Sequence, residues 1–181
     1  MARILTAREL STVQMVSIRD AAKEKLLDYA VRESGKARKD FCVRDAMPLT
    51  DFGLGTELWD NNATLVAGTW SNDWSKQLPK TKYVAFYGIV NRSTDPQVIG
   101  TKFKVGQSGQ TTRDVVMHGR MLAEDTPKCF FETIIYKGDE WIYIEHYNGS
   151  TSNLNAGDEL IELQALVAEL YGDMISGPLP Y

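Results

Sequence analysis

Apolar side chains at the start of the chain recur at spacings of three and four, which is the period of a helix. On one face of that helix lie Leu10, Val13, Ile18, Ala22, Leu26 and Tyr29. Thr6 and Glu9 fit a capping box at its start, and Gly35 fits a C-cap at its end. We therefore predict an amphipathic helix over residues 7–34.

The pattern changes after residue 39. Apolar and polar positions now tend to alternate, and clusters of Gly, Pro, Asn, Asp and Ser separate runs of β-branched and aromatic residues. These runs predict strands at residues 40–45, 83–90, 98–105, 113–117, 129–136, 141–147 and 159–167. No crossover helices separate them, so the sheets should be antiparallel. The expected fold is mainly β: an antiparallel β-sandwich domain over residues 40–181, preceded by an N-terminal amphipathic helix arm over residues 1–39.

Residues 47–82 are rich in Gly, Pro and Asn, and predict a long loop with one short strand near residues 64–67. Residues 137–140 have the length and the glycine of a hairpin connection. Residues 159–170 fit both a strand and a helix face. We predict a strand there, because turn residues precede the segment and Gly172 follows it.

The helical face needs a cover, because no second helix is predicted to pack on it. It lies either across the sandwich or on a neighbouring subunit. Four residues of this face, Leu10, Val13, Ile18 and Leu26, are therefore candidate partner-binding residues. If the helix is an arm, deletion of residues 1–39 should leave a folded β-rich body that no longer assembles.

Charge is distributed unevenly along the 181 residues, whose formal net charge is −4. Residues 1–39 hold nine basic and five acidic side chains, whereas no Lys or Arg follows Lys137. This asymmetry is either chance or a sign of partner surfaces, such as a head-to-tail contact between copies. The acidic body would repel phosphate, so nucleic acid is not an expected partner.

Tryptophans gather in the predicted loop region, where Trp59, Trp70 and Trp74 stand beside Asp, Asn or Ser. We rank three interpretations of them. They cover the end of the sandwich, they anchor a protein partner, or they stack on sugar rings. All three tryptophans are therefore candidate partner-binding residues.

The sequence offers little catalytic chemistry. His118 and His146 have no second metal ligand at helical or hairpin spacing, and the cysteines form no CxxC pair. Cys129 and His146 would make a nucleophilic pair only if their strands were adjacent, and cysteines in apolar strands are usually inert. Residues 60–62 and 72–73 carry calcium-type oxygen ligands without the spacing of an EF-hand, and are read as solvated turns. We predict no enzyme, no metal and no cofactor.

Cys42 and Cys129 are expected to be free thiols in a protein made in a reducing cytoplasm. The first ten residues contain no apolar segment typical of a signal peptide, and no apolar run is long enough to span a bilayer. A membrane is therefore not an expected partner.

Five runs carry a family resemblance: FYGIV, VIGTKFKVGQSG, TRDVV, CFFETIIYKGDEWIYIEHYN and DELIELQALVAELYGDMISGP. In order, they resemble structural proteins of tailed-phage virions, of the head decoration or minor capsid type, over residues 41–178, and this resemblance implies that the sandwich is jelly-roll-like. The resemblance implies a non-enzymatic virion protein, made in the host cytoplasm. Such a protein binds the capsid or neck surface, other copies of itself and other virion proteins. The alternative is a carbohydrate-binding module that uses the loop tryptophans, with a surface glycan as its ligand.

Overall fold

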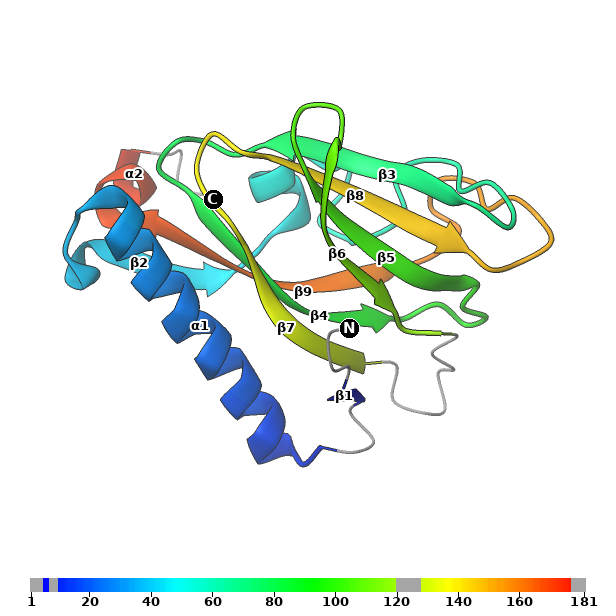
Figure 1. Cartoon of the computed structure of the whole chain (residues 1–181), viewed down its shortest axis with the longest axis horizontal. Coiled ribbons are helices and arrows are strands. Elements are labelled where there is room, and N and C mark those ends of the chain that lie inside the picture. The colour runs from blue at the N-terminus through cyan, green and yellow to red at the C-terminus, as the bar shows by residue number, and fades with distance from the viewer. Residues whose placement is uncertain (1–4, 7–9, 120–127, 177–181) are drawn as a thin grey trace.

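The computed structural model describes residues 5–6, 10–119 and 128–176. Within these residues, two helices, α1 and α2, nine strands, β1 to β9, and two single helical turns, η2 and η3, follow one another (Figure 1). Their bounds are β1 Leu5–Thr6, α1 Thr12–Ser34, η2 Arg38–Asp40, β2 Phe41–Asp45, η3 Pro48–Phe52, β3 Trp70–Gln77, β4 Tyr83–Asn91, β5 Val98–Val105, β6 Thr111–Met117, β7 Lys128–Tyr136, β8 Trp141–Asn148, β9 Ile161–Leu170 and α2 Tyr171–Ser176.

Helix α1 begins later than its apolar spacing predicts. The Ser11 hydroxyl accepts a hydrogen bond from the Gln14 amide, and the Gln14 side chain accepts one from the Ser11 amide at 2.8 Å. The capping box is therefore at Ser11, and the predicted box at Thr6 is wrong because Thr6 belongs to β1. Glu9 and the predicted start at residue 7 lie outside the described residues. The C-cap at Gly35 is confirmed, with φ of 68° and its amide donating to the Val31 carbonyl.

The strands form two antiparallel sheets. The first has the order β1-β7-β4-β9-β2 and the second the order β3-β8-β5-β6. Pairing is nested along the chain: β2 pairs with β9, β3 with β8, β4 with β7 and β5 with β6. Eight strands in this order make a jelly roll, with β1 added at one edge. The predicted mainly β, jelly-roll-like sandwich is confirmed.

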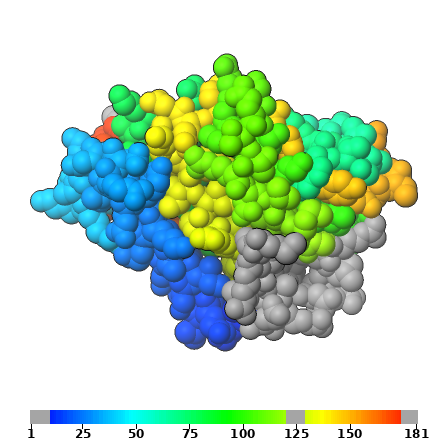
Figure 2. All heavy atoms as spheres, in the orientation of Figure 1, coloured from blue at the N-terminus to red at the C-terminus, as the bar shows by residue number. Residues whose placement is uncertain are grey.

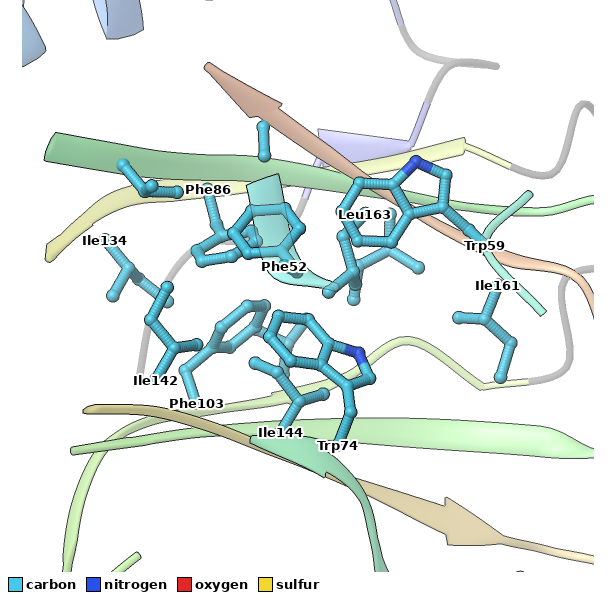
Figure 3. Close-up of a cluster of buried hydrophobic side chains, with 14 of the residues drawn as sticks. Phe52, Trp59, Trp74, Phe86, Phe103, Ile134, Ile142, Ile144, Ile161 and Leu163 are labelled. Carbon is cyan, nitrogen blue, oxygen red and sulfur yellow. The ribbon is translucent and has the colours of Figure 1, made fainter. Parts of the chain in front are cut away.

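Aromatic rings fill the space between the two sheets. Phe86 of β4 and Phe103 of β5 are fully buried, and their ring centroids lie 5.3 Å apart. Phe52 of η3 stacks on Phe86 at 6.1 Å (Figure 3). Because each ring comes from a different element, this cluster joins both sheets and the η3 turn into one core.

Helix α1 covers the outer face of the first sheet (Figure 1). Ala22, Leu26, Leu27 and Ala30 are buried against residues of β2, β4, β7 and β9. Of the two expected covers for the helical face, the chain's own sandwich is therefore the one observed for this part of the helix. Deleting residues 1–39 would expose the apolar side chains beneath α1, so we no longer expect a folded remainder.

The predicted loop region is more regular than its composition indicates. It contains the π-helical turn η3 and the eight-residue strand β3, and the expected short strand near residues 64–67 is only an isolated bridge between Leu65 and Leu154. Strand β3 has the polar sequence WSNDWSKQ, and its register shifts between Asn72 and Trp74. This bulge interrupts the alternation of apolar positions, which explains why the pattern did not reveal a strand.

Residues 137–140 do not close the predicted hairpin, because β7 and β8 belong to different sheets. At Gly138 a Cβ would lie 2.0 Å from the Lys80 carbonyl oxygen, so this connection between the sheets requires glycine.

The ambiguous segment after residue 159 is a strand, as predicted. Its second half is buried on both faces, which also gives it the apolar spacing of a helix.

We predict that Leu26→Ala lowers the free energy of unfolding by about 2–5 kcal/mol, because the fully buried side chain would leave a cavity between α1 and the first sheet. Val13→Ala is the matched control on the same helix. Val13 is 75% exposed, and its truncation should change stability by less than about 0.5 kcal/mol. Urea denaturation of both variants measures the difference, and equal effects would contradict the packing of α1 as described.

Candidate binding surface

Among the described residues, no helical layer comparable to α1 covers the outer face of the second sheet, since α1 and α2 pack on strands of the first sheet. Figure 2 shows α1 in blue at the lower left, away from the green atoms of β5 and β6. We call this surface the outer face and define it by nine side chains: Trp70, Asn72, Lys102, Lys104, Val115, Met117, Tyr143, Glu145 and Tyr147. The face carries half-buried aromatic rings, and Val115 and Met117 are 41% and 49% exposed.

Strand register arranges these nine side chains in three rows across the four strands, and Gly100, Ser75 and Thr112 occupy the remaining positions of the rows. The first row is Trp70, Tyr147, Gly100 and Met117. The second row is Asn72, Glu145, Lys102 and Val115, and the third is Ser75, Tyr143, Lys104 and Thr112. The face therefore has one mainly apolar row, one mainly polar row and one mixed row.

Side chains of the first row meet over Gly100. A Cβ at this glycine would lie 2.7 Å from the Met117 sulfur and 2.9 Å from the Trp70 ring atom Cη2. The rings of Trp70 and Tyr147 pack edge to face with centroids 5.4 Å apart. The Lys102 ammonium lies 4.1 Å from the Trp70 ring centroid, within the range of a cation–π contact. The absence of a side chain at Gly100 thus lets Trp70 and Met117 approach each other.

Charges in the other two rows are linked through Glu145. Its carboxylate contacts the ammonium of Lys104 at 2.7 Å and that of Lys102 at 3.7 Å. Lys104 also lies 5.5 Å from the centroid of the Tyr143 ring. All three charged side chains are less than a quarter exposed, so they are held against the sheet. Such preorganised side chains lose little entropy on binding, which suits contact with another surface or with a planar ring.

Of the three candidate tryptophans, only Trp70 lies on the outer face. Trp59 and Trp74 are 9% and 6% exposed and point into the core around Phe52 (Figure 3). Their assignment as partner-binding residues is corrected, because these rings pack inside the sandwich. The interpretation ranked first for the tryptophans therefore applies to two of them.

The four candidate residues on α1 also differ in their exposure to solvent. Leu26 is fully buried and unavailable to a partner, which corrects its assignment. Leu10 and Ile18 are partly buried against the cluster of apolar side chains between α1 and the first sheet. Val13 and its neighbour Val16 are 75% and 54% exposed, so the first turns of α1 present an apolar edge to solvent.

Much of the charge asymmetry is satisfied within the chain. In the stretch without basic residues, Glu140 pairs with Arg113, Glu162 with Arg92, and Glu169 with Arg44 and Lys82. Near the N-terminus, Arg19 pairs with Asp45, and Arg38 pairs with Glu24 and Asp28. These internal pairs account for much of the asymmetry without the expected head-to-tail contact.

Arg44 also belongs to a buried ion-pair network at one end of the sandwich. It contacts Asp51 at 2.7 Å and Glu169 at 2.8 Å, and Lys82 lies 3.0 Å from Asp51. Asp51 and Glu169 are almost fully buried. Despite its burial, the pKa of Asp51 is lowered by hydrogen bonds from Arg44, Met47 and Lys82. The network ties η3 to β2 and β9, so we assign it a structural role.

The structure does not bring Cys129 and His146 together as a nucleophilic pair, because β7 and β8 lie in different sheets. Cys42 and Cys129 are free thiols, as predicted, and burial raises the pKa of Cys129 to about 12.

Asn61 and Asp73 are buried residues whose side chains form hydrogen bonds with the backbone of the loops, which corrects their interpretation as solvated turns. Among the described residues, no group of three or more His, Cys, Asp or Glu is placed to hold a metal ion.

Within the described part of the chain, no helix is both long and apolar enough to cross a membrane.

No family model and no curated protein match this chain. A solved subviral particle of infectious bursal disease virus VP2 is similar over 73% of this chain and 33% of that chain, at 11% identity and a TM-score of 0.39. The Gx strain of the same virus is similar over 77% and 34%, at 13% identity and a TM-score of 0.38. This chain thus spans about a third of those chains. The likeness to these viral proteins is weak.

We predict that Gly100→Ala displaces the Trp70 ring, because the added Cβ would lie within 3.0 Å of both Trp70 and Met117. The indole NH resonance of Trp70 should shift and the ring should become more accessible to acrylamide. Gly55→Ala is the control, since a Cβ at this exposed glycine would meet nothing within 4 Å beyond its chain neighbours. An unchanged Trp70 resonance in Gly100→Ala would contradict the described packing of the first row.

Proposed function

We propose that this chain is a non-enzymatic structural protein of a virion, which assembles with copies of itself and with other virion proteins through the outer face. The finer assignment is a head decoration or minor capsid protein of a tailed phage, bound to the capsid or neck surface. It would be made in the host cytoplasm and incorporated into the virion.

The observation that carries the proposal is the outer face: a preorganised surface with half-buried aromatic rings on a rigid sandwich. Trp, Tyr and Met are enriched where proteins bind one another, and the first row combines all three. The jelly roll is an architecture shared by viral capsid domains and lectins, which supports both a virion role and its alternative. The tailed-phage assignment is supported by the resemblance of the strand sequences.

The exposed edge at Val13 and Val16 offers a second, smaller contact near the start of α1. It lies on the helix that covers the first sheet, whereas the outer face belongs to the second sheet. Two contacts on different layers would let one copy touch two neighbours, which an assembly larger than a dimer requires.

A carbohydrate-binding function is the second candidate, favoured by the position of Trp70. This ring is half-buried, and polar Asn72 and Lys102 occupy the next row. A sugar would stack on Trp70 alone among the three candidate tryptophans, because Trp59 and Trp74 are buried.

Sedimentation velocity over a range of protein concentrations tests self-assembly. We expect the unaltered protein to form oligomers and Met117→Asp to shift them towards monomer, because the variant places a charge in the apolar row. Leu58→Asp is the matched control: Leu58 is 57% exposed and lies outside the outer face, so this variant should assemble normally. A protein that remains monomeric at every concentration would contradict self-assembly.

Glycan titration separates the alternative. Under the virion proposal, tryptophan fluorescence should stay constant during titration with a panel of neutral and acidic oligosaccharides. A saturable change that disappears in Trp70→Ala would instead support carbohydrate binding through the outer face.

A further inference from the structure

Strand β6 lies at one edge of the second sheet, and most of its side chains are exposed (Figure 1). In the described part of the chain, β5 is its only neighbour in the sheet. At the opposite edge, Asp73 of β3 accepts hydrogen bonds from the amides of Asn62 and Ala63. Ser71 of the same strand accepts one from the amide of Val66. A loop therefore covers β3, whereas no described segment pairs with the outer side of β6.

A bulge at Arg113 divides β6 into two parts. Asp114 lies opposite Phe103 of β5, and the register then shifts by one residue, which leaves Arg113 as an extra residue on β6. The Arg113 guanidinium donates a hydrogen bond to the carbonyl of Ile135 in β7. A bulge and a charged side chain are two devices that protect an edge from further strands. The part of β6 before the bulge is therefore blocked, and residues 114–118 follow it as a regular segment.

In this regular segment, two amides point away from β5. The His118 amide donates to the Ile99 carbonyl of β5 at 3.1 Å. Because successive amides of a strand point in opposite directions, the amides of Met117 and Val115 point outwards, to the open side of the sheet. The Val115 amide donates to the Asp114 carboxylate at 2.8 Å instead of to β5, which agrees with this direction.

The side chains of the same two residues are apolar and exposed, at 41% for Val115 and 49% for Met117. Both belong to the outer face, and each stands at the end of its row, on the edge strand. A strand edge with outward amides and exposed apolar side chains is a template for pairing with a further strand.

We propose that residues 114–118 pair antiparallel with the same residues of a second copy, about a two-fold axis at Val116, so that the second sheets of two copies form one continuous sheet. The inference rests on the proposed self-assembly and names the contact through which two copies meet. In this register Val115 of one copy lies opposite Met117 of the other. The two such pairs exchange about four backbone hydrogen bonds in all.

A second copy fits this edge because the segment is complementary to itself. Its centre is Val116, and a two-fold axis there uses the same surface of both copies. The exposed side chains of Val115 and Met117 then cover one another on both sides of the axis. Asp114 lies opposite His118, so no two acids and no two bases face each other across the pair, an arrangement that would be destabilising.

Asp114 competes with this pairing, because its carboxylate occupies the Val115 amide that the second strand requires. The carboxylate must turn to solvent before the amide can donate to the other copy. Hydrogen bonds to charged groups are stronger than those between neutral groups, so this competition weakens the dimer. The charge thus limits pairing at an edge that is otherwise open.

Disulfide cross-linking of two variants tests the pairing and its register. Val115→Cys and Met117→Cys are made separately in the full chain, each with Cys42→Ser to remove the partly exposed native thiol. Opposite residues of a hydrogen-bonded pair have Cα atoms about 5.5 Å apart, which a disulfide spans, whereas the 115–115 and 117–117 pairs would be about 7–8 Å apart. A mixture of the two variants should therefore cross-link on oxidation, and either variant alone should not.

The cross-linking is done at a concentration at which sedimentation velocity shows oligomers, so that its outcome is separated from that of the proposed function. Oligomers without cross-linking in the mixture, or equal cross-linking of either variant alone, would overturn the β6 pairing and leave assembly through the outer face standing. A protein that stays monomeric at every concentration would contradict both.

Asp114→Ala provides a second test, in which pairing is expected to become stronger. Without the competing carboxylate, the dissociation constant of the dimer should fall by about tenfold. Asp95→Ala is the matched control, because it removes the same charge from an exposed position outside β6 and should leave the dissociation constant unchanged. Sedimentation velocity measures both variants. An equal dissociation constant in Asp114→Ala and Asp95→Ala would overturn the assignment of the Val115 amide as a pairing group.

Discussion

Strand β4 is buried along its whole length, and this burial on two faces organises the molecule. Val84 and Phe86 point into the core between the sheets, while Ala85 and Tyr87 pack beneath α1. The chain therefore needs a layer on each side of the first sheet: the second sheet inside and the helix outside. Once these layers are in place, the outer face of the second sheet is left without a helical layer in the part of the chain that the structure describes. The candidate binding surface is thus a consequence of how the core is completed.

Much of this fold could be predicted from the sequence, and the failures have local physical causes. Seven strands follow from β-branched and aromatic runs. Strand β3 did not, because its bulge at Asp73 and its polar composition hide the alternation. The same doubly buried environment that makes β9 apolar on both faces also made it resemble a helix. The start of α1 was misplaced because Thr6 and Glu9 matched a capping box that Ser11 and Gln14 actually form.

The candidate site was harder to predict than the fold, because it depends on register between distant strands. Trp70, Tyr147, Gly100 and Met117 stand far apart in sequence and meet only across four paired strands. Alternation along β5 and β8 marks Lys102 and Tyr143 as outward positions, but it does not say which residues lie beside them. The charge asymmetry suggested a head-to-tail contact for a similar reason: ion pairs such as that of Arg44 with Glu169 connect segments that only the folded chain brings together.

We propose that the outer face becomes an interface when the protein assembles. Carbene footprinting of dilute and assembled protein tests it directly, because Met117 and Met47 are exposed methionines on different surfaces, at 49% and 39%. We expect Met117 and Trp70 to lose labelling on assembly, while labelling of Met47 is unchanged. Continued labelling of Met117 in the assembled state, with protection at Met47 instead, would contradict it.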